Sequence, residues 1–87
     1  MDAIYIDAET GAVEIVDWKT GRVPRGDEIP IRTFQLELYR LAYARRYEIP
    51  IESVSARLVY LAAGEEIPAE GLTEAQIVAK IARAAAH

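Results

Sequence analysis

The sequence lacks several features that would point to particular classes of protein. It contains no cysteine, which excludes disulfides and thiolate metal sites. No run of about 18 apolar residues occurs, so no membrane span is expected. The N-terminus has no basic segment followed by an apolar one, so no secretory signal is expected. No Walker motif is present, so we assign no ATP-driven motor to this chain. Together these absences fit a cytoplasmic protein.

The residues that are present have the composition of a small folded domain with an uneven charge. Of the 87 residues, 52% are apolar and the net charge is −4. Residues 1–18 carry five acidic and no basic side chains, whereas residues 19–57 carry eight basic and five acidic ones. An acidic hairpin beside a basic segment suits a site that holds cations and then phosphate. The alternative is that these are ordinary solvated surface charges.

Hydrophobic periodicity and turn residues predict an α+β domain spanning residues 1–87. The predicted order is strand, strand, helix, strand, helix, with the helices flanking a β-sheet. The sheet is predicted to be mixed, because a strand–helix–strand crossover makes the two strands that it joins parallel. In the helix, Phe34, Leu38, Leu41 and Ala42 are predicted to form the apolar stripe. The predicted elements are strands over 3–7 and 12–17, a loop over 20–30, a helix over 31–47, a strand over 53–62, a loop over 64–71 and a helix over 74–84 that begins with a Thr73–Gln76 capping box.

The strongest chemical pattern is Asp17-Trp18-Lys19 at the end of the second strand. Side chains two apart on a strand share a face, so Asp17 and Lys19 point together and Trp18 points away and packs. If the hairpin turn centres between residues 9 and 10, Asp2 lies directly opposite Asp17, and a divalent cation between the two would explain the pairing. A three-residue loop with Gly11 left-handed would shift this register. Asp-x-Lys can also be a surface ion pair, and Asp2 a solvated terminal residue.

Further candidates lie in the loop and the helix that follow. Gln35 and Tyr39 are one helical turn apart and could contact the sheet end near Lys19, or could be a solvated side chain and a core-edge aromatic. Arginine suits phosphate oxygens, so the basic loop could follow a DNA backbone, although most such charge runs are only solvated. The arginines concerned are Arg22, Arg25 and Arg32.

In combination, these patterns resemble the RecB-type nucleases of the PD-(D/E)XK superfamily, found at the C-terminus of UvrD- and RecB-type helicases. Residues 11–21, GAVEIVDWKTG, resemble the strand motif that leads into Asp-aromatic-Lys-Thr-Gly. Residues 35–39, QLELY, resemble the Gln-x-x-x-Tyr helix motif. Residues 2–5 resemble the end of a Gly-x-Ile-Asp motif, and residues 55–61 resemble the strand after the motif helix.

The resemblance implies a role for each matching residue. It implies Asp2, Asp17 and the backbone carbonyl of Trp18 as ligands of Mg²⁺ or Mn²⁺. Lys19 would position or deprotonate the attacking water, and Gln35 and Tyr39 would support the site. The implied activity is metal-dependent hydrolysis of DNA, as the exonuclease module of an ATP-dependent helicase in repair and recombination.

The sequence also departs from the family pattern. The helix and strand that begin the family's restriction-endonuclease-like core would precede Asp2, so we expect the chain to be a fragment of a larger helicase-nuclease. We expect weak or absent cleavage by the isolated chain, and homodimerisation or strand exchange through an open sheet edge. The alternatives are a catalytically inactive nuclease fold that binds DNA or a subunit, and a small interaction protein unrelated to nucleases. Only the active nuclease requires metal binding.

Overall fold

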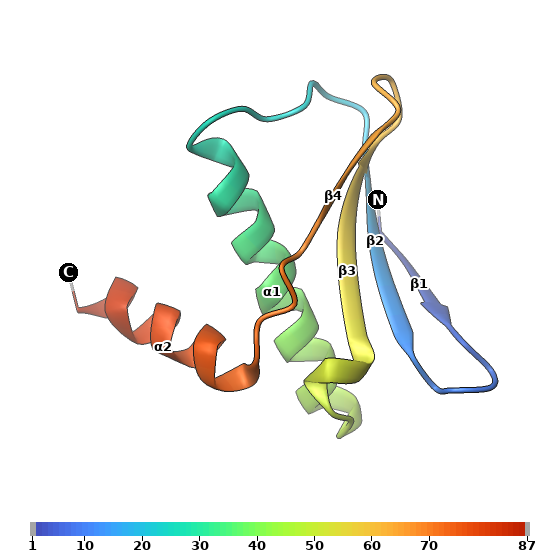
Figure 1. Cartoon of the computed structure of the whole chain (residues 1–87), viewed down its shortest axis with the longest axis vertical. Coiled ribbons are helices and arrows are strands. Elements are labelled where there is room, and N and C mark those ends of the chain that lie inside the picture. The colour runs from blue at the N-terminus through green and yellow to red at the C-terminus, as the bar shows by residue number, and fades with distance from the viewer. Residues whose placement is uncertain (1, 87) are drawn as a thin grey trace.

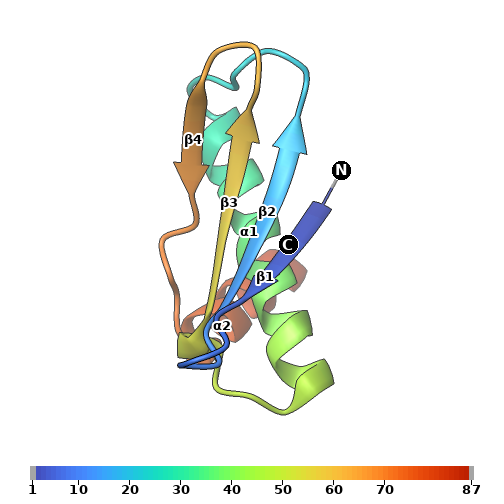
Figure 2. The ribbon, with the colours of Figure 1, turned by 90° about the vertical axis from the view of Figure 1, so that its right-hand side faces the viewer.

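The computed structural model describes residues 2–86 and consists of one four-stranded sheet with two helices. The helix α1 runs behind the sheet when the sheet is viewed from its open face (Figure 2), and α2 projects outward beyond α1 (Figure 1). This agrees with the predicted α+β class and mixed sheet. The elements in chain order are β1 (Asp2–Ile6), β2 (Val13–Lys19), α1 (Glu28–Tyr47), the short 3₁₀ helix η1 (Ile51–Ser53), β3 (Val54–Tyr60), β4 (Glu65–Pro68) and α2 (Glu74–Ala85).

The spatial order of the strands, β1-β2-β3-β4, follows their order in the chain. β1 pairs antiparallel with β2, β2 pairs parallel with β3, and β3 pairs antiparallel with β4. The parallel pair is the one joined by the α1 crossover, as predicted. Its register sets Lys19 beside Tyr60, so both strands end at the same edge of the sheet.

The predicted element order lacked one strand, and one predicted boundary was wrong. β4 lies inside the predicted 64–71 loop, where a four-residue edge strand pairs with β3. Its last residue, Pro68, is tolerated because an edge strand needs hydrogen bonds on one side only. The 20–30 loop also ends earlier than predicted, because α1 begins at Glu28 and includes Pro30. Proline is compatible with the first helical turn, where its missing N–H would have no intrahelical partner.

The core lies between α1 and the helix-facing side of β2 and β3. Val13, Ile15, Val54, Ala56 and Leu58 are buried there because alternate residues of paired strands share a face. The predicted face of β3, which carries Val54, Leu58 and Tyr60, is confirmed.

The face that α1 buries differs from the predicted stripe. Leu38 is partly exposed and Ala42 is exposed. The buried residues are instead Leu36, Glu37, Arg40, Leu41 and Ala44.

An ion pair between two buried side chains accounts for this rotation of α1. The Arg40 guanidinium donates to Glu37 Oε1 at 2.6 Å, and Arg40 and Glu37 are 3% and 1% exposed. Arg40 also donates to the carbonyls of Val54, Ile51 and Leu72. The other Glu37 oxygen accepts from the backbone N–H groups of Gly71 and Leu72. These bonds join α1 to η1, to β3 and to the segment before α2.

The two helix ends agree with the sequence signals. α1 stops at Glu48, whose left-handed backbone (φ 54°) closes the helix before Pro50. At α2, Gln76 N–H donates to the Thr73 hydroxyl at 3.1 Å and Thr73 N–H donates to the Gln76 side chain at 2.9 Å, so the predicted capping box is confirmed. Within residues 2–86, neither helix has the length and apolar character needed to cross a bilayer.

Candidate active site

The β1–β2 hairpin places Asp2 directly opposite Asp17. Its turn is held by the Asp7 carboxylate, which accepts from Glu9 N–H at 2.8 Å, while Asp7 N–H donates to the Ala12 carbonyl at 2.8 Å. Gly11 is left-handed (φ 78°), but residues 8–11 form a four-residue loop, so the shifted register does not occur. Opposed residues of an antiparallel pair have Cβ atoms about 5 Å apart, which brings the two carboxylates together.

Asp17 and Lys19 form an ion pair on the helix-facing side of β2. Lys19 Nζ lies 3.1 Å from Asp17 Oδ2, and the side chains of Lys19 and Asp17 are 36% and 7% exposed. Asp17 thus occupies a buried strand position in line with Val13 and Ile15. Trp18 is half-buried and, by strand alternation, points to the opposite face. The end of β2 therefore presents a carboxylate and an ammonium group together on its helix-facing side.

The pairing of acids changes the protonation of Asp2. Partial burial, a hydrogen bond with the Asp17 carboxyl and the charge of Asp17 raise the pKa of Asp2 above its ordinary value, and Lys19 opposes the shift. A second cation beside the acids would reverse this effect.

Tyr39 lies in a groove that begins at Asp2. This groove, of about 310 Å³, runs between β1 and α1, and Ile15, Tyr43 and Tyr47 also line it. Tyr39 thus shares this groove with Asp2 and is 45% exposed. Gln35 lies one turn earlier on α1 and is exposed.

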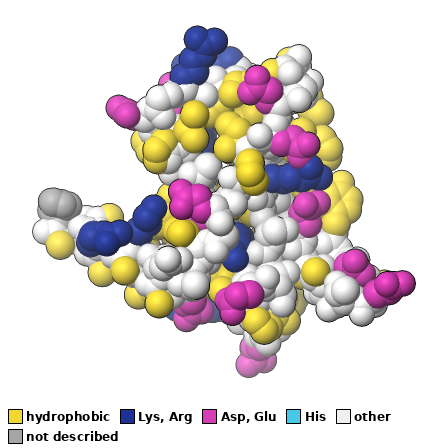
Figure 3. Space-filling model, viewed as in Figure 1, with side chains coloured by type: hydrophobic (Ala, Val, Ile, Leu, Met, Phe, Trp, Pro, Cys, Tyr) yellow, Lys and Arg dark blue, Asp and Glu magenta, His cyan; other side chains and the backbone are white. Residues whose placement is uncertain are grey.

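The three predicted phosphate-binding arginines lie in different surroundings. Arg22 is 73% exposed and pairs with Glu28 at 3.2 Å. Arg25 lines a second groove, between the 20–27 loop and the β3–β4 turn. Arg32 is exposed on α1. Basic side chains project at this end of the molecule beside apolar ones (Figure 3).

The family model of the PD-(D/E)XK nuclease superfamily matches residues 1–87. The chain belongs to the PD-(D/E)XK nuclease superfamily. Neither a curated protein nor a solved structure matches the chain.

PD-(D/E)XK nucleases typically use divalent metal ions, and the residues of this chain fit such an ion in part. Two carboxylates face each other, but residues 2–86 hold no group of three or more side chains of the ligating types. Mg²⁺ is usually bound through one or two carboxylates, with waters and substrate phosphates as the other ligands. Asp2 and Asp17 would therefore offer oxygen donors of the kind that a hard cation takes.

Sequence reasoning missed part of the surroundings of this candidate site. Tyr43 and Tyr47 follow Tyr39 at four-residue intervals, so the i, i+4 rule could have placed them on one face. In the buried Glu37–Arg40 pair, Glu37 lies between Gln35 and Tyr39 and Arg40 directly follows Tyr39, so the pair orients the part of α1 that carries both candidates. Its only sequence signal is an acid and a base three residues apart, which is typical of exposed helices too.

Proposed function

We propose that this chain is a metal-dependent deoxyribonuclease module that hydrolyses phosphodiester bonds in DNA. Membership of the superfamily supports nuclease chemistry in general. The observation that carries the proposal for this chain is the facing pair Asp2–Asp17 with Lys19 at 3.1 Å from Asp17. Two acids in opposed strand positions repel each other, and a cation bound between them would offset this repulsion.

Each residue has a role in the proposed reaction. Asp2 and Asp17 would hold Mg²⁺ or Mn²⁺, with the Trp18 carbonyl as a further ligand. The bound cation would lower the pKa of a water molecule and stabilise charge that develops at phosphorus. Lys19 would orient the attacking water and offset negative charge on the phosphate, in a partly desolvated position where such interactions are stronger.

The helix and the basic loop would bind the substrate. Tyr39 shares a groove with Asp2 and would contact the nucleotide there, while Gln35 would support the site from the preceding turn. Arg22, Arg25 and Arg32 would neutralise DNA phosphates, which sets the register of a strand without reading its sequence.

We further propose that the module acts within a UvrD/RecB-type ATP-dependent helicase used in repair and recombination. The support is the joint occurrence of Asp17-Trp18-Lys19 and of Gln35 and Tyr39 in the order of the RecB-type motifs. The rest of that protein or complex would supply the motor and would be the partner of this chain.

The alternative is a nuclease fold that has lost catalysis and binds DNA or a subunit. It is favoured by the finding that only two acids, and no third ligating side chain, gather within residues 2–86. Such a scaffold has no need for Asp17 to remain an acid, so metal binding separates the two proposals.

Calorimetric titration with Mn²⁺ tests the proposal directly. We expect saturable binding to the chain and its loss in Asp17→Ala. Asp27→Ala is the matched control, because Asp27 is an exposed acid at the start of α1 whose side chain makes no capping bond. Equal binding by both variants, or none by the unchanged chain, would contradict a catalytic metal site.

A further inference from the structure

Two buried charged side chains on α1 have no part in the reaction proposed above. Glu37 and Arg40 are 1% and 3% exposed, and theirs is the ion pair within residues 2–86 in which both partners are buried. Apolar residues of similar volume would often stabilise a fold as well as a buried ion pair does, so stability alone does not account for such a pair. Its place on the helix that carries Gln35 and Tyr39 points to a second role.

The pair connects α1 with three other segments of the chain. The Arg40 guanidinium donates to backbone carbonyls on η1, on β3 and before α2, those of Ile51, Val54 and Leu72. The second Glu37 oxygen accepts from two backbone N–H groups of the segment before α2, at 3.1 and 3.2 Å. Hydrogen bonds have preferred directions, so bonds to several segments at once fix the rotation of α1 about its own axis.

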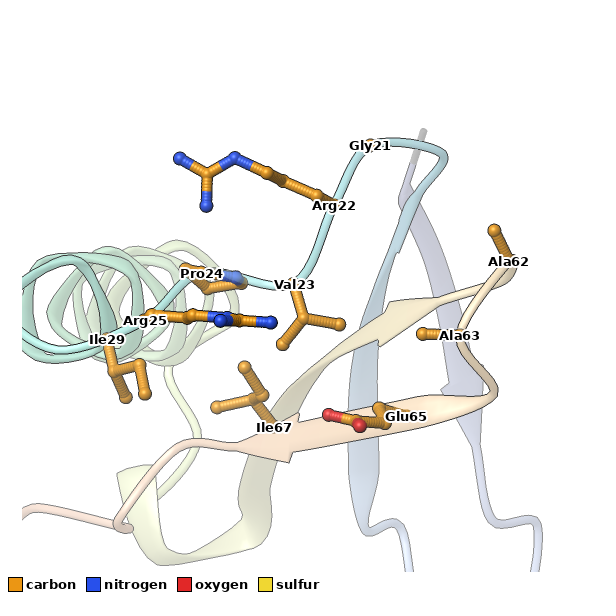
Figure 4. A pocket seen from close by; sticks show the side chains of 10 residues that line it. All are labelled: Gly21, Arg22, Val23, Pro24, Arg25, Ile29, Ala62, Ala63, Glu65 and Ile67. Carbon is orange, nitrogen blue, oxygen red and sulfur yellow. The ribbon is translucent and has the colours of Figure 1, made fainter.

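The start of α1 is attached to the sheet less firmly. Ile29 lines the open groove of about 880 Å³ between the 20–27 loop and the β3–β4 turn (Figure 4). An exposed ion pair also joins this first turn to the loop, and such pairs contribute little. The bonds of the Glu37–Arg40 pair therefore decide how the middle of α1, where Tyr39 lies, packs on the sheet.

The observed rotation of α1 differs from the one that its apolar residues alone would favour. A helix turns by about 100° per residue, so the apolar stripe is centred about 110° around α1 from the face that is buried. The residues of that stripe are Phe34, Leu38, Leu41 and Ala42. Packing of the stripe against the sheet would turn Arg40 out to solvent. The sequence of α1 thus allows two packings, and the buried pair favours the observed one.

The observed rotation is also the one that places the tyrosines of α1 beside β1. Tyr39, Tyr43 and Tyr47 line the groove of about 310 Å³ that begins at Asp2. In the alternative packing, Tyr39 would lie on the opposite side of the α1 axis and Tyr43 would point away from the sheet. The place of Tyr39 next to the candidate active site therefore depends on which face of α1 is buried.

We propose that Glu37 and Arg40 are positioning residues, which hold α1 in the rotation that sets Tyr39 beside Asp2. This inference rests on the proposed nuclease function, in which Tyr39 contacts the nucleotide. Glu37 lies two residues before Tyr39 and Arg40 directly follows it, so the hydrogen bonds act within one helical turn of the tyrosine. Both residues act through the backbone of α1 and not by contact with the substrate.

Nuclear magnetic resonance of the whole chain, without divalent cations, measures this positioning. In the parent chain we expect nuclear Overhauser effects between the Tyr39 ring and the methyl groups of Ile4 and Ile15, because all three residues line one groove. The double variant Glu37→Ala with Arg40→Ala leaves no buried charge and keeps a strong helix former at both positions. We expect about a twofold loss of the Tyr39 effects in this variant, as for two packings of equal free energy. Effects of unchanged intensity would overturn the inference.

Two comparisons separate loss of positioning from loss of folding. Tyr43 and Tyr47 lie on the same helix with ring centroids 4.5 Å apart, so their mutual Overhauser effect should persist in every variant in which α1 forms. Ile77→Ala removes a fully buried side chain of α2 and should lower stability to a comparable extent. The Tyr39 effects of the folded chain should nevertheless remain in Ile77→Ala. An equal loss there would contradict the inference, because general destabilisation would then be the cause.

Arg40→Lys keeps the inference testable if the double alanine variant does not fold. Lysine retains the charge beside Glu37, but its ammonium group lacks the planar fork that reaches carbonyls on three segments. Spectra in trimethylamine N-oxide, which favours the folded state, should show weaker Tyr39 effects for Arg40→Lys. The matched control is Arg45→Lys, an exposed position on the same helix, which should leave them unchanged. Equal Tyr39 effects in the two lysine variants would refute the inference.

Failure of the positioning inference and failure of the nuclease proposal give different results. The Overhauser effects need no metal, whereas the catalytic proposal requires Mn²⁺ binding that depends on Asp17. Such binding, together with unchanged Tyr39 effects in the variants, would overturn the positioning role alone. Loss of the Tyr39 effects in the variants, without Mn²⁺ binding by the parent chain, would support the positioning role and contradict the catalytic proposal.

Discussion

Replacing Arg40 with alanine should remove a large part of the folding free energy of this chain. The guanidinium is 3% exposed and binds Glu37 and three backbone carbonyls, from Val54, Ile51 and Leu72. Removing one partner of a buried pair leaves the other charge uncompensated, which costs about 3–5 kcal/mol. A chain of 87 residues has a total stability of about 4–13 kcal/mol at the usual value per residue. The variant should therefore be near the limit of folding.

Urea unfolding followed by far-ultraviolet circular dichroism measures this loss. Arg45→Ala is a matched control on the same helix, because Arg45 pairs with Glu74 at 3.3 Å and both side chains are more than half exposed. The control should lose less than about 1 kcal/mol. The double variant Glu37→Leu with Arg40→Met should regain only part of the lost stability, because it leaves no buried charge but removes the side-chain partners of three backbone carbonyls and two backbone N–H groups. Equal losses for Arg40→Ala and Arg45→Ala would refute the reasoning.

Three further predictions concern the acids, the second helix and the sheet edge. A cation must displace the proton that the raised pKa of Asp2 favours, so Mn²⁺ affinity should fall as pH is lowered through that pKa. Calorimetry at several pH values should show a weaker dependence of Mn²⁺ affinity on pH for Asp2→Asn, and equal profiles for the two chains would contradict this. Thr73→Ala should cost about 1 kcal/mol through loss of the capping box, measured by urea unfolding, and no change would argue against the cap. The edge strand β1 exposes Ile6 at 62%, so the chain should dimerise and Ile6→Lys should reduce dimerisation in light scattering; a monomeric parent chain would count against it.

Local sequence signals predicted the hairpin but left two registers open. The turn residues around Asp7 and Gly11 allowed either loop length, and the folded hairpin has the register that places Asp2 opposite Asp17. A one-residue shift would move every side chain to the other face, so a buried face specifies the register strongly.

Other features depend on contacts that a single sequence does not reveal. β4 has little apolar pattern of its own and forms by pairing with β3. The buried face of α1 was missed because Glu37 and Arg40 were counted as polar, although each satisfies the other and several backbone groups. The groove at Arg25 needs the 20–27 loop and the β3–β4 turn to lie together, which only the folded chain shows.

The acidic pair has a cost to the metal-free fold that points to its function. Asp17 takes a buried position in line with Val13 and Ile15, where an apolar side chain would pack without desolvating a charge. Asp2 adds to this cost because its pKa is raised in the folded chain. The stability that protonated Asp2 contributes is present at low pH and is lost as pH rises through the pKa of the folded chain. A pair that weakens the fold near neutral pH is expected where function needs it. A cation that binds only the folded chain would offset the loss by mass action, so saturating Mn²⁺ should raise the unfolding free energy of the chain and leave that of Asp17→Ala unchanged.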